Sequence, residues 1–483
     1  MVESRQKFLT DILYSFLPFT ISKLRGILVI PILTKLLGPG SYGVWVQYSI
    51  TLILLTKIAG LGLQNSMNRY LTQATDNQIK EDYYTVLAVS FSVAIIFSII
   101  IVAFRKTIAN ALFPTSNGEL ILFLLAVTVI TNIYFVQTLN LLRSQRKIKD
   151  MNLWRSVRIL GEIGCLLIGG LVLKSILNVL VGIVLLYISI SLLLSVRILA
   201  EIGFSIPQFQ NVRSYLNFGL PLLFSTLAYW IVNTSDRYII TYFLSLEAVG
   251  AYSVIYSLAT VVGMVSHPVV NVLFPDLSAL HEDGATEEFL ARFGDVVRYF
   301  LLFAVPAVIG LIVLREPTVR FLSTAEISGD ADLMILLAPA LAAYGLFNIF
   351  VQILKTHEKA TYVGLLWVTV AVSNISLNLA LVPTSGVLGA AIATLLAFSF
   401  GVVVAGWTLR EELLQVRLNL PKLMFSTAIM GGTVWVLKQQ FSLVGGFRLF
   451  GLVGTGLVVF VALTYVLGLV SKDELRTLRT LFN

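Results

Sequence analysis

The sequence predicts an all-α integral membrane protein with about fourteen transmembrane helices. Of the 483 residues, 57% are hydrophobic and only 12% are charged, and the mean hydropathy is +0.89. Soluble domains carry about a quarter of their residues as Asp, Glu, Lys or Arg. Apolar stretches recur from residue 12 to residue 470 with only short connections between them, so the membrane region makes up nearly the whole chain.

A window of about 20 residues, the length that crosses the hydrocarbon core as a helix, gives the individual spans. The predicted spans are 12–36, 44–68, 84–104, 118–142, 151–173, 176–197, 215–243, 247–274, 296–314, 332–354, 361–382, 386–409, 421–437 and 447–470. The first span exceeds the length of a signal peptide and lacks a small-residue cleavage pattern, so we expect it to be retained as a helix.

The distribution of basic residues predicts the orientation. With a cytoplasmic N-terminus, seventeen Lys and Arg residues lie in cytoplasmic connections and six in outer ones. Cytoplasmic connections are enriched in basic residues, so both termini are predicted to face the cytoplasm, with the chain in the cytoplasmic (inner) membrane of the cell. The longest connection, 275–295, has the pattern of an amphipathic linker rather than of a catalytic domain.

Composition and motifs argue against several functions. The residues behind the net charge of +8 are spread over many connections, unlike the basic stripe of a nucleic-acid-binding protein. The single cysteine, Cys165, lies in an apolar stretch, and His267, His281 and His357 lack metal-ligand spacing. A phosphate-binding GxxxxGKS or GxxxxGKT loop is absent from the sequence. We therefore expect no metal, no cofactor, no nucleic acid and no ATP hydrolysis.

Two pairs of motifs indicate an internal repeat. Gly43 lies in TKLLGPGSYGVW and Gly250, 207 residues later, in TYFLSLEAVGAYSVIY; LLRSQRKIKDMNLW ends at Trp154 and ILKTHEKATYVGLLW at Trp367. Six helices, an even number, separate the copies, which implies parallel repeats related by an axis along the membrane normal. Chance similarity of short apolar stretches is the alternative. The predicted domains are a six-helix lobe in 1–205, a second six-helix lobe in 206–415 and two appended helices in 416–483.

Several glycine-containing stretches resemble the multidrug/oligosaccharidyl-lipid/polysaccharide exporter superfamily, most closely its polysaccharide transporter branch of Wzx-type flippases. They are PILTKLLGPGSYGVW (31–45), GLGLQNSMNRYL (60–71), FGLPLLFSTLAYWIVNTSDRYIITYFLSLEAVGAYSVIYSL (218–258) and LNLALVPTSGVLGAAIAT (377–394). The last is similar to the family's turn between helices eleven and twelve. The resemblance implies a two-lobed, fourteen-helix flippase for a polyprenyl-linked oligosaccharide.

Charged side chains inside predicted spans are costly and usually face a bundle interior or a water-filled cavity, so they are candidate site residues. Arg25 lies near the middle of the first span, on one face with Asp11, Ser15 and Ser22 at about 100° per residue. In the functional interpretation, its guanidinium binds the pyrophosphate of a lipid-linked ligand. A buried ion pair with an acid on a neighbouring helix is the structural alternative, and the sequence leaves both open.

The span 215–243 carries a second polar face with three candidate substrate-binding residues, Asn233, Asp236 and Arg237. The first and seventh helices are related by the predicted repeat, so we expect them to face each other. Asp236 would then orient Arg237 toward phosphate. A structural pair near the outer surface, where long side chains reach water, is the alternative.

Two further spans contain charged candidates. Lys57 lies near the middle of the second span, where a lysine needs a partner, a phosphate or a path to water, and it is a candidate substrate contact. In the fifth span, Arg155, Arg158 and Glu162 share an arc of about 60°. The i,i+4 spacing of Arg158 and Glu162 favours a direct pair. Glu162 is also the candidate proton carrier for ion coupling.

The sequence therefore predicts a flippase that moves a polyprenyl-pyrophosphate-linked oligosaccharide by alternating access, for assembly of cell-surface polysaccharide such as O-antigen. It is not an enzyme in this interpretation. Its predicted partners are the lipid-linked oligosaccharide, membrane lipids and other membrane proteins of glycan assembly. One alternative is an organic cation exporter of the same superfamily, whose cleft should favour acidic residues. Another is a membrane-embedded polysaccharide polymerase or ligase, which we would expect to have a large outer loop.

Overall fold

The computed structural model describes most of the chain, and the described residues form helices joined by short connections, without a strand among them. They are residues 21–22, 25–26, 28–71, 75–266, 276–357, 359–416, 418–440 and 446–470. Asp11 and Ser15, predicted to share a face with Arg25, lie outside the described residues, as does His267. By its internal contacts the chain divides into two compact units, 1–250 and 251–483. The predicted lobe limits at 205 and 415 stay predictions.

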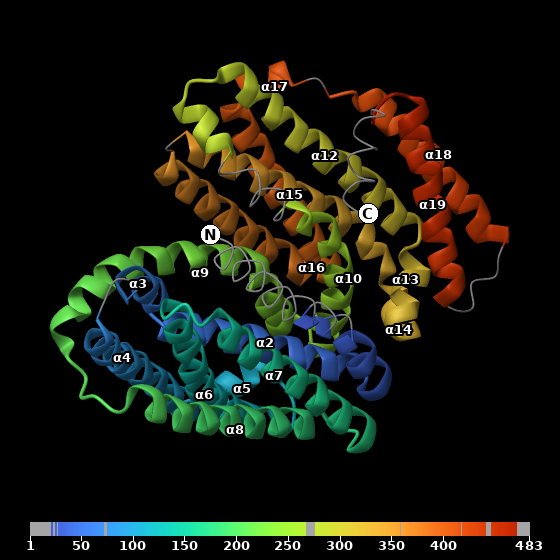
Figure 1. The fold of residues 1–483 in the computed structure, drawn as a ribbon. Coiled ribbons are helices and arrows are strands. Elements are labelled where there is room, and N and C mark those ends of the chain that lie inside the picture. Colours follow the sequence, from blue (N-terminus) through green and yellow to red (C-terminus); the bar gives the residue numbers. More distant parts are fainter. Residues whose placement is uncertain are drawn as a thin grey trace. The chain divides into compact units, whose positions relative to one another are not determined.

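The first unit is a helical bundle built around α6, which packs against α2, α4, α7 and α8 (Figure 1). α6 is central because it is apolar around most of its circumference, with Leu125, Val129 and Ile133 fully buried. The helices are α2 (Pro39–Ala59), α3 (Leu63–Tyr70), α4 (Asp76–Ala103), α5 (Arg105–Leu112), α6 (Gly118–Ser144), α7 (Ile148–Leu167), α8 (Ile176–Ile202), α9 (Val212–Phe243) and the first residues of α10 (Leu246–Met264).

The second unit has α15 near its centre, packed against α12 and α16. The last two helices, α18 and α19, pair with each other, and α18 also packs against α12. Besides the remainder of α10, its helices are α12 (Thr286–Val313), α13 (Arg315–Leu322), α14 (Ala325–Gly329), α15 (Met334–Thr356), α16 (Ala360–Thr408), α17 (Arg410–Gln415), α18 (Leu420–Gln440) and α19 (Gly446–Val466).

Eleven helices in the described part of the chain are long and apolar enough to cross a membrane. One of them, α16, covers two predicted spans. α7 covers most of the predicted span 151–173 but carries too many charged residues to be counted as apolar. A short apolar helix, Leu28–Leu37, overlaps the end of the first predicted span. Each predicted span thus coincides at least in part with a helix, and a count of fourteen requires the inclusion of α7 and Leu28–Leu37.

α16 contains a reversal of the chain. A straight helix of its 49 residues would be more than twice as long as the hydrocarbon core, which is about 30 Å thick. Gly386 breaks the helix with φ 59° and ψ −144°, a conformation that glycine adopts without steric cost. A Cβ added to Gly389 would lie 2.4 Å from the carbonyl oxygen of Leu381, so the chain folds back on itself. The turn predicted within 377–394 is confirmed.

The two repeat glycines, Gly43 and Gly250, touch each other in the first unit. A Cβ added to Gly43 would lie 1.8 Å from the carbonyl oxygen of Leu246, and one added to Gly250 would lie 2.2 Å from that of Pro39. Pro39 and Leu246 are separated in sequence by the same 207 residues as the glycines. Each motif therefore places a carbonyl on the glycine of the other. A two-fold relation produces this kind of exchange, which supports the predicted repeat.

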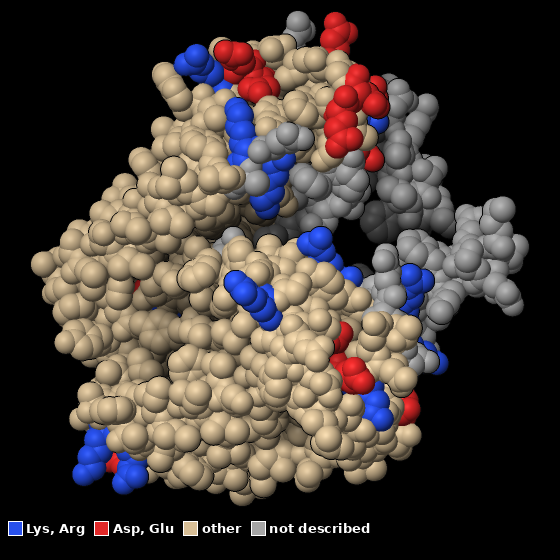
Figure 2. Space-filling view, turned by 90° about the vertical axis from the view of Figure 1, so that its left-hand side faces the viewer, with Lys and Arg blue, Asp and Glu red and all other residues tan. Residues whose placement is uncertain are grey.

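The outward-facing side chains are largely apolar. On α8, Leu192, Leu193 and Val196 are each more than half exposed. Broad areas of the surface seen in Figure 2 carry neither Lys, Arg, Asp nor Glu. A soluble protein rarely exposes continuous apolar surface on this scale, whereas lipid chains cover such a surface at little cost. The chain is a multi-pass membrane protein.

His281 and His357, both predicted to lie in loops, form a stacked pair in the second unit. His357 follows α15, but His281 lies in a short helix, residues 276–282, so its predicted loop position is wrong. Their ring centroids are 4.6 Å apart. Among the described residues, no group of three His, Cys, Asp or Glu side chains is arranged to hold a metal ion.

This pair predicts a dependence of stability on pH. Burial and then the positive charge of His281 lower the pKa of His357; Glu412, at 3.8 Å, opposes this shift and Lys359 adds to it. His357 is more readily protonated in the unfolded state. Its contribution to the stability of the folded state is therefore complete above the unfolded-state pKa of about 6.5 and is lost as the pH falls below that pKa. We expect the Tm in detergent to decrease between about pH 7 and pH 5, and less steeply in His357→Gln. An equal decrease in the variant would contradict this assignment.

Candidate functional site in the first unit

Arg25 and Glu162 form an ion pair: the Arg25 guanidinium donates a hydrogen bond to Oε2 of Glu162 on α7. The Glu162 side chain is 2% exposed, whereas that of Arg25 is 31% exposed. An acid on a neighbouring helix, the structural alternative for Arg25, is therefore present. Arg25 is nevertheless partly accessible to a ligand.

Glu162 has two further partners. Nε of Arg158 lies 3.3 Å from its Oε1, which matches the predicted i,i+4 pair. The hydroxyl of Tyr187 on α8 donates to the same oxygen at 2.7 Å. These partners offset the cost of burying the carboxylate charge.

A chain of amide and hydroxyl groups extends this arrangement to α6 and α2. The Arg158 guanidinium donates to Oδ1 of Asn132 at 2.8 Å, and Nδ2 of Asn132 donates to Oγ1 of Thr56 at 2.9 Å. The guanidinium of Arg158 also lies 4.5 Å from the ring centroid of Phe135, a favourable cation–π distance. These contacts fix the orientation of Arg158. The Glu162 network is hereafter Arg25, Thr56, Asn132, Arg158, Glu162 and Tyr187.

The Glu162 network holds an excess of positive charge. It contains two guanidiniums, Arg25 and Arg158, and one carboxylate, Glu162, so one positive charge is uncompensated within it. Charge at membrane depth is costly and is retained mainly where it meets a partner or a substrate. Guanidinium groups bind phosphate oxygens in a bidentate manner. An anion beside Arg25 would complete the charge balance of the network.

Lys57 follows Thr56 in α2 and is partly buried. Its Nζ lies 5.9 Å from the ring centroid of Trp230 on α9, within the range of a cation–π interaction. Among the residues that the structure describes, no carboxylate forms an ion pair with Lys57. A cation held by an aromatic face keeps its charge available to an anionic ligand.

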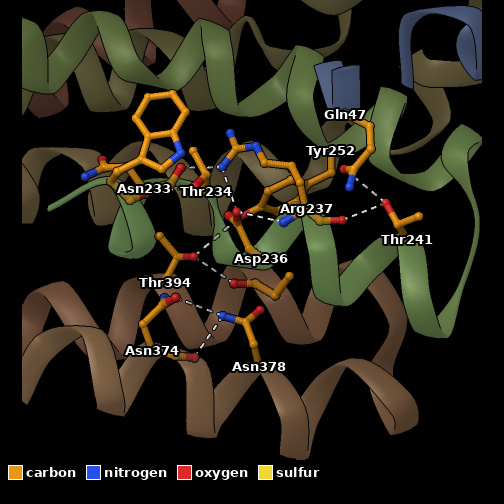
Figure 3. A network of polar contacts seen from close by, with 12 residues as sticks. Gln47, Asn233, Thr234, Asp236, Arg237, Thr241, Tyr252, Asn374, Asn378 and Thr394 are labelled. Atoms are coloured by element: carbon orange, nitrogen blue, oxygen red, sulfur yellow. Dashed lines mark hydrogen bonds and ion pairs between the residues drawn. The ribbon is translucent and has the colours of Figure 1, made fainter. Parts of the chain in front are cut away.

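Asp236 and Arg237 form a buried pair on α9 (Figure 3). Oδ1 of Asp236 accepts a hydrogen bond from the Arg237 guanidinium at 2.7 Å and from its backbone N–H at 2.9 Å. The guanidinium also donates to the backbone carbonyl of Asn233 at 2.8 Å. The side chains are 3% and 7% exposed, so this pair does not reach water by extending outward. Asp236 thus contacts the Arg237 guanidinium, and its role in orienting Arg237 toward phosphate stays a prediction.

Hydrogen bonds join α9 to α2 beside this pair. Thr241 donates to Oε1 of Gln47 at 3.3 Å, as Figure 3 shows, and the hydroxyls of Tyr238 and Thr51 are 3.1 Å apart. These contacts fix the helix that carries Asp236 and Arg237 against the helix that carries Lys57. The expectation that the first and seventh helices face each other stays a prediction, since the first span is described only in part.

Sequence reasoning identified the charged residues of the Glu162 network but missed three polar ones, Thr56, Asn132 and Tyr187. A lone amide or hydroxyl in an apolar span is common, so each carried little signal by itself. Asn132 lies near the middle of the predicted span 118–142, and this depth in the membrane was a signal of a bridging role. Its partners depend on how four helices pack, which periodicity does not specify.

The second unit contains an apolar groove of about 520 Å³ formed by α12, α15, α16 and α18. Phe300, Pro339, Val403 and Met424 come from these four helices in turn. Ser399 and Thr427 are the only hydroxyl-bearing residues among those that line it, so water gains few hydrogen bonds there. The groove suits an apolar chain rather than a sugar.

The helical architecture is that of a multi-pass membrane protein. It is similar to the solved structure of the lipid II flippase MurJ in an inward closed conformation, with a TM-score of 0.74 and 17% identity over 94% of this chain and 98% of that one. It is also similar to an inward-facing multidrug resistance MATE family transporter of the MOP superfamily, with a TM-score of 0.61 and 16% identity over 84% of this chain and all of that one. At these identities the likeness shows the fold alone.

Residues 32–327, more than half of the chain, match the family described as Polysaccharide biosynthesis protein. The chain belongs to this family, and the resemblance to the polysaccharide branch of the exporter superfamily is confirmed. Two similar proteins of Haloferax volcanii are the probable low-salt glycan biosynthesis flippase Agl15, 22% identical over 53% of this chain and 55% of that protein, and the probable flippase AglR, 22% identical over 35% and 36%. The match spans about half the length of the first relative and less of the second.

Proposed function

We propose that this protein is a flippase that moves a polyprenyl-pyrophosphate-linked oligosaccharide across the cytoplasmic membrane for the assembly of a cell-surface glycan. The observation that carries the proposal is the uncompensated positive charge of the Glu162 network, with Arg25 partly accessible. A pyrophosphate is the anionic group of such a substrate. Membership of a polysaccharide biosynthesis family and similarity to two proteins named as probable flippases support it.

In the proposed mechanism the chain supplies binding and movement without covalent chemistry, so the protein is not an enzyme. Arg25 binds a pyrophosphate oxygen, while Glu162 and Asn132 hold Arg158 in a fixed orientation beside it. Lys57 and Arg237 contact the phosphate in other stages of alternating access, with Asn233 and Asp236 orienting Arg237. The oligosaccharide is released outside while the polyprenyl chain stays in lipid. Glu162 is the candidate proton carrier, and both termini face the cytoplasm.

An organic cation exporter fits these contacts less well. Such a protein needs a carboxylate whose charge is available to the cation. Glu162 contacts two arginines and Asp236 contacts Arg237, so both candidate-site carboxylates already have positive partners. The likeness to a multidrug transporter is one of fold and gives no reason to prefer this function.

The test is reconstitution into liposomes with a fluorescent polyprenyl-pyrophosphate oligosaccharide, following its protection from an external quencher. We expect Arg25→Ala to reduce the initial rate by about 10- to 100-fold, because hydrogen bonds to charged groups contribute about 1.5–3 kcal/mol. Folding should persist, since Glu162 keeps Arg158 and Tyr187 as partners. Arg105→Ala is the control, because Arg105 is exposed and pairs with Glu119 at 2.7 Å. Efflux of organic cations without glycan movement would contradict the proposal.

A further inference from the structure

A line of arginines leads from the end of α6 along α7 to the Glu162 network. Arg143 lies in the last turn of α6, and Arg155 and Arg158 lie one turn apart on α7. Arg143 and Arg155 lie on consecutive helices that pack against each other, and Arg155 lies one turn from Arg158, so the positive charges of Arg143 and Arg158 both act on Arg155. The three guanidiniums thus follow one another along the two helices, and of the three only Arg158 contacts Glu162.

Arg155 is exposed on the side of α7 that faces away from lipid. Leu153, Val157 and Leu160 form an exposed apolar stripe along α7, as expected for a surface that contacts lipid chains. At about 100° per residue, Arg155 lies about 200° around the helix from Leu153, on the opposite side. Arg155 therefore shares the face of α7 that carries Glu162.

The charges around this line are unevenly compensated. At the same end of the unit, Lys147 pairs with Glu201, and Arg197 pairs with Asp150 at 2.5 Å. Within the described ranges, by contrast, no carboxylate forms an ion pair with Arg143 or Arg155. Two neighbouring guanidiniums that repel each other and lack an acid attract an anion.

We propose that Arg143 and Arg155 form a capture site where the pyrophosphate of the lipid-linked substrate binds before it reaches Arg158 and Arg25. This inference rests on the proposed function for the identity of the substrate. The capture site supplies a bidentate contact from each guanidinium, and the anion relieves their mutual repulsion. Transfer inward then moves the phosphate from Arg143 and Arg155 to Arg158 and Arg25.

Loss of a capture residue should raise the density of substrate that gives half-maximal flipping rather than lower the maximal rate. The first measurement is the binding of geranyl pyrophosphate, a short prenyl pyrophosphate, to the intact protein in phosphatidylcholine nanodiscs. The second is the dependence of glycan flipping in liposomes on the density of lipid-linked substrate. We expect Arg155→Gln to raise both the Kd and the half-saturating density about tenfold, with the maximal rate within about twofold, as for loss of one charge-assisted contact. Arg155→Lys should restore most of the binding.

Arg213→Gln is the matched control and should behave as the wild type. Arg213 is exposed at the start of α9 in the same unit and, like Arg155, has no ion pair among the described residues. Arg155→Gln should keep its Tm, because its loss removes repulsion. An unchanged Kd and half-saturating density would overturn the capture site. The capture site would also be overturned if Arg155→Gln kept its affinity for geranyl pyrophosphate and lost only the phosphatidylglycerol that co-purifies with the wild type. Arg155 would then bind a phospholipid headgroup.

The two readouts separate this inference from the proposed function. Geranyl pyrophosphate binding that depends on Arg155, in a wild-type protein that flips no glycan, would overturn the flippase and support the capture site. Glycan flipping by a protein whose geranyl pyrophosphate binding does not depend on Arg155 would support the flippase and overturn the capture site. A wild-type protein that neither binds the pyrophosphate nor flips the glycan would overturn both.

Discussion

Replacing Gly43 with alanine should destabilise the protein by about 3 kcal/mol, the upper range for overpacking a closely packed interior. The new Cβ would lie 1.8 Å from the carbonyl oxygen of Leu246 and 3.3 Å from the backbone nitrogen of Gly250. Both obstacles are backbone atoms of α10, so no change of rotamer relieves the clash. α2 and the start of α10 would have to separate, and the reciprocal contact between the two repeat glycines would be lost. The fall in Tm in detergent measures the effect.

Gly40→Ala is a matched control on the same helix. Its Cβ would meet a side-chain oxygen of Glu247 at 2.7 Å, and that flexible side chain can move away. We expect its Tm to stay close to that of the wild type. If Gly43→Ala behaved like Gly40→Ala, the close approach of α2 and α10 would not contribute to stability, and the reciprocal contact would lose its significance for the repeat.

Most helices could be predicted from the sequence because each depends on local apolar length. The turn near Gly386 was also predictable, since glycine and proline in a long apolar run mark a break. α7 shows where this reasoning reaches its limit. Its charged residues make it a poor span by hydropathy, yet Glu162 is buried and Arg158 partly buried because other helices supply partners for them.

The charged residues of the candidate site could be predicted from the sequence, whereas the contacts that join them between helices could not. The cost of charge at membrane depth singled out Arg25 and Glu162, and the i,i+4 spacing singled out the pair of Glu162 with Arg158. The pairing of Arg25 with Glu162 joins residues 137 positions apart and depends on helix packing. Tyr187 and Asn132 enter the network for the same reason. Long-range contacts of this kind have no local signal in a single sequence.

Replacing Glu162 with glutamine should reduce stability by on the order of 3 kcal/mol, the lower range for breaking a buried ion pair. Glutamine keeps an oxygen that can accept from Tyr187, but Arg25 and Arg158 then lack a carboxylate in a weakly hydrated environment. The partial exposure of both arginines keeps the loss toward the lower end of that range. Glu201→Gln is the control, because Glu201 pairs with Lys147 and Arg197 but is 26% exposed. Thermal unfolding in detergent compares the two variants.

The same variant separates a structural role of Glu162 from proton coupling. A carboxylate that only positions Arg25 and Arg158 should, when replaced, lower the flipping rate by a similar factor at every pH. A carboxylate that carries a proton should also give the wild type a response to a pH gradient across the liposome membrane, and Glu162→Gln should abolish that response. Unchanged transport in the variant at all pH values would exclude Glu162 as the proton carrier. The excess charge of the network would then act on the substrate alone, since a lasting positive site needs only an anion to complete it.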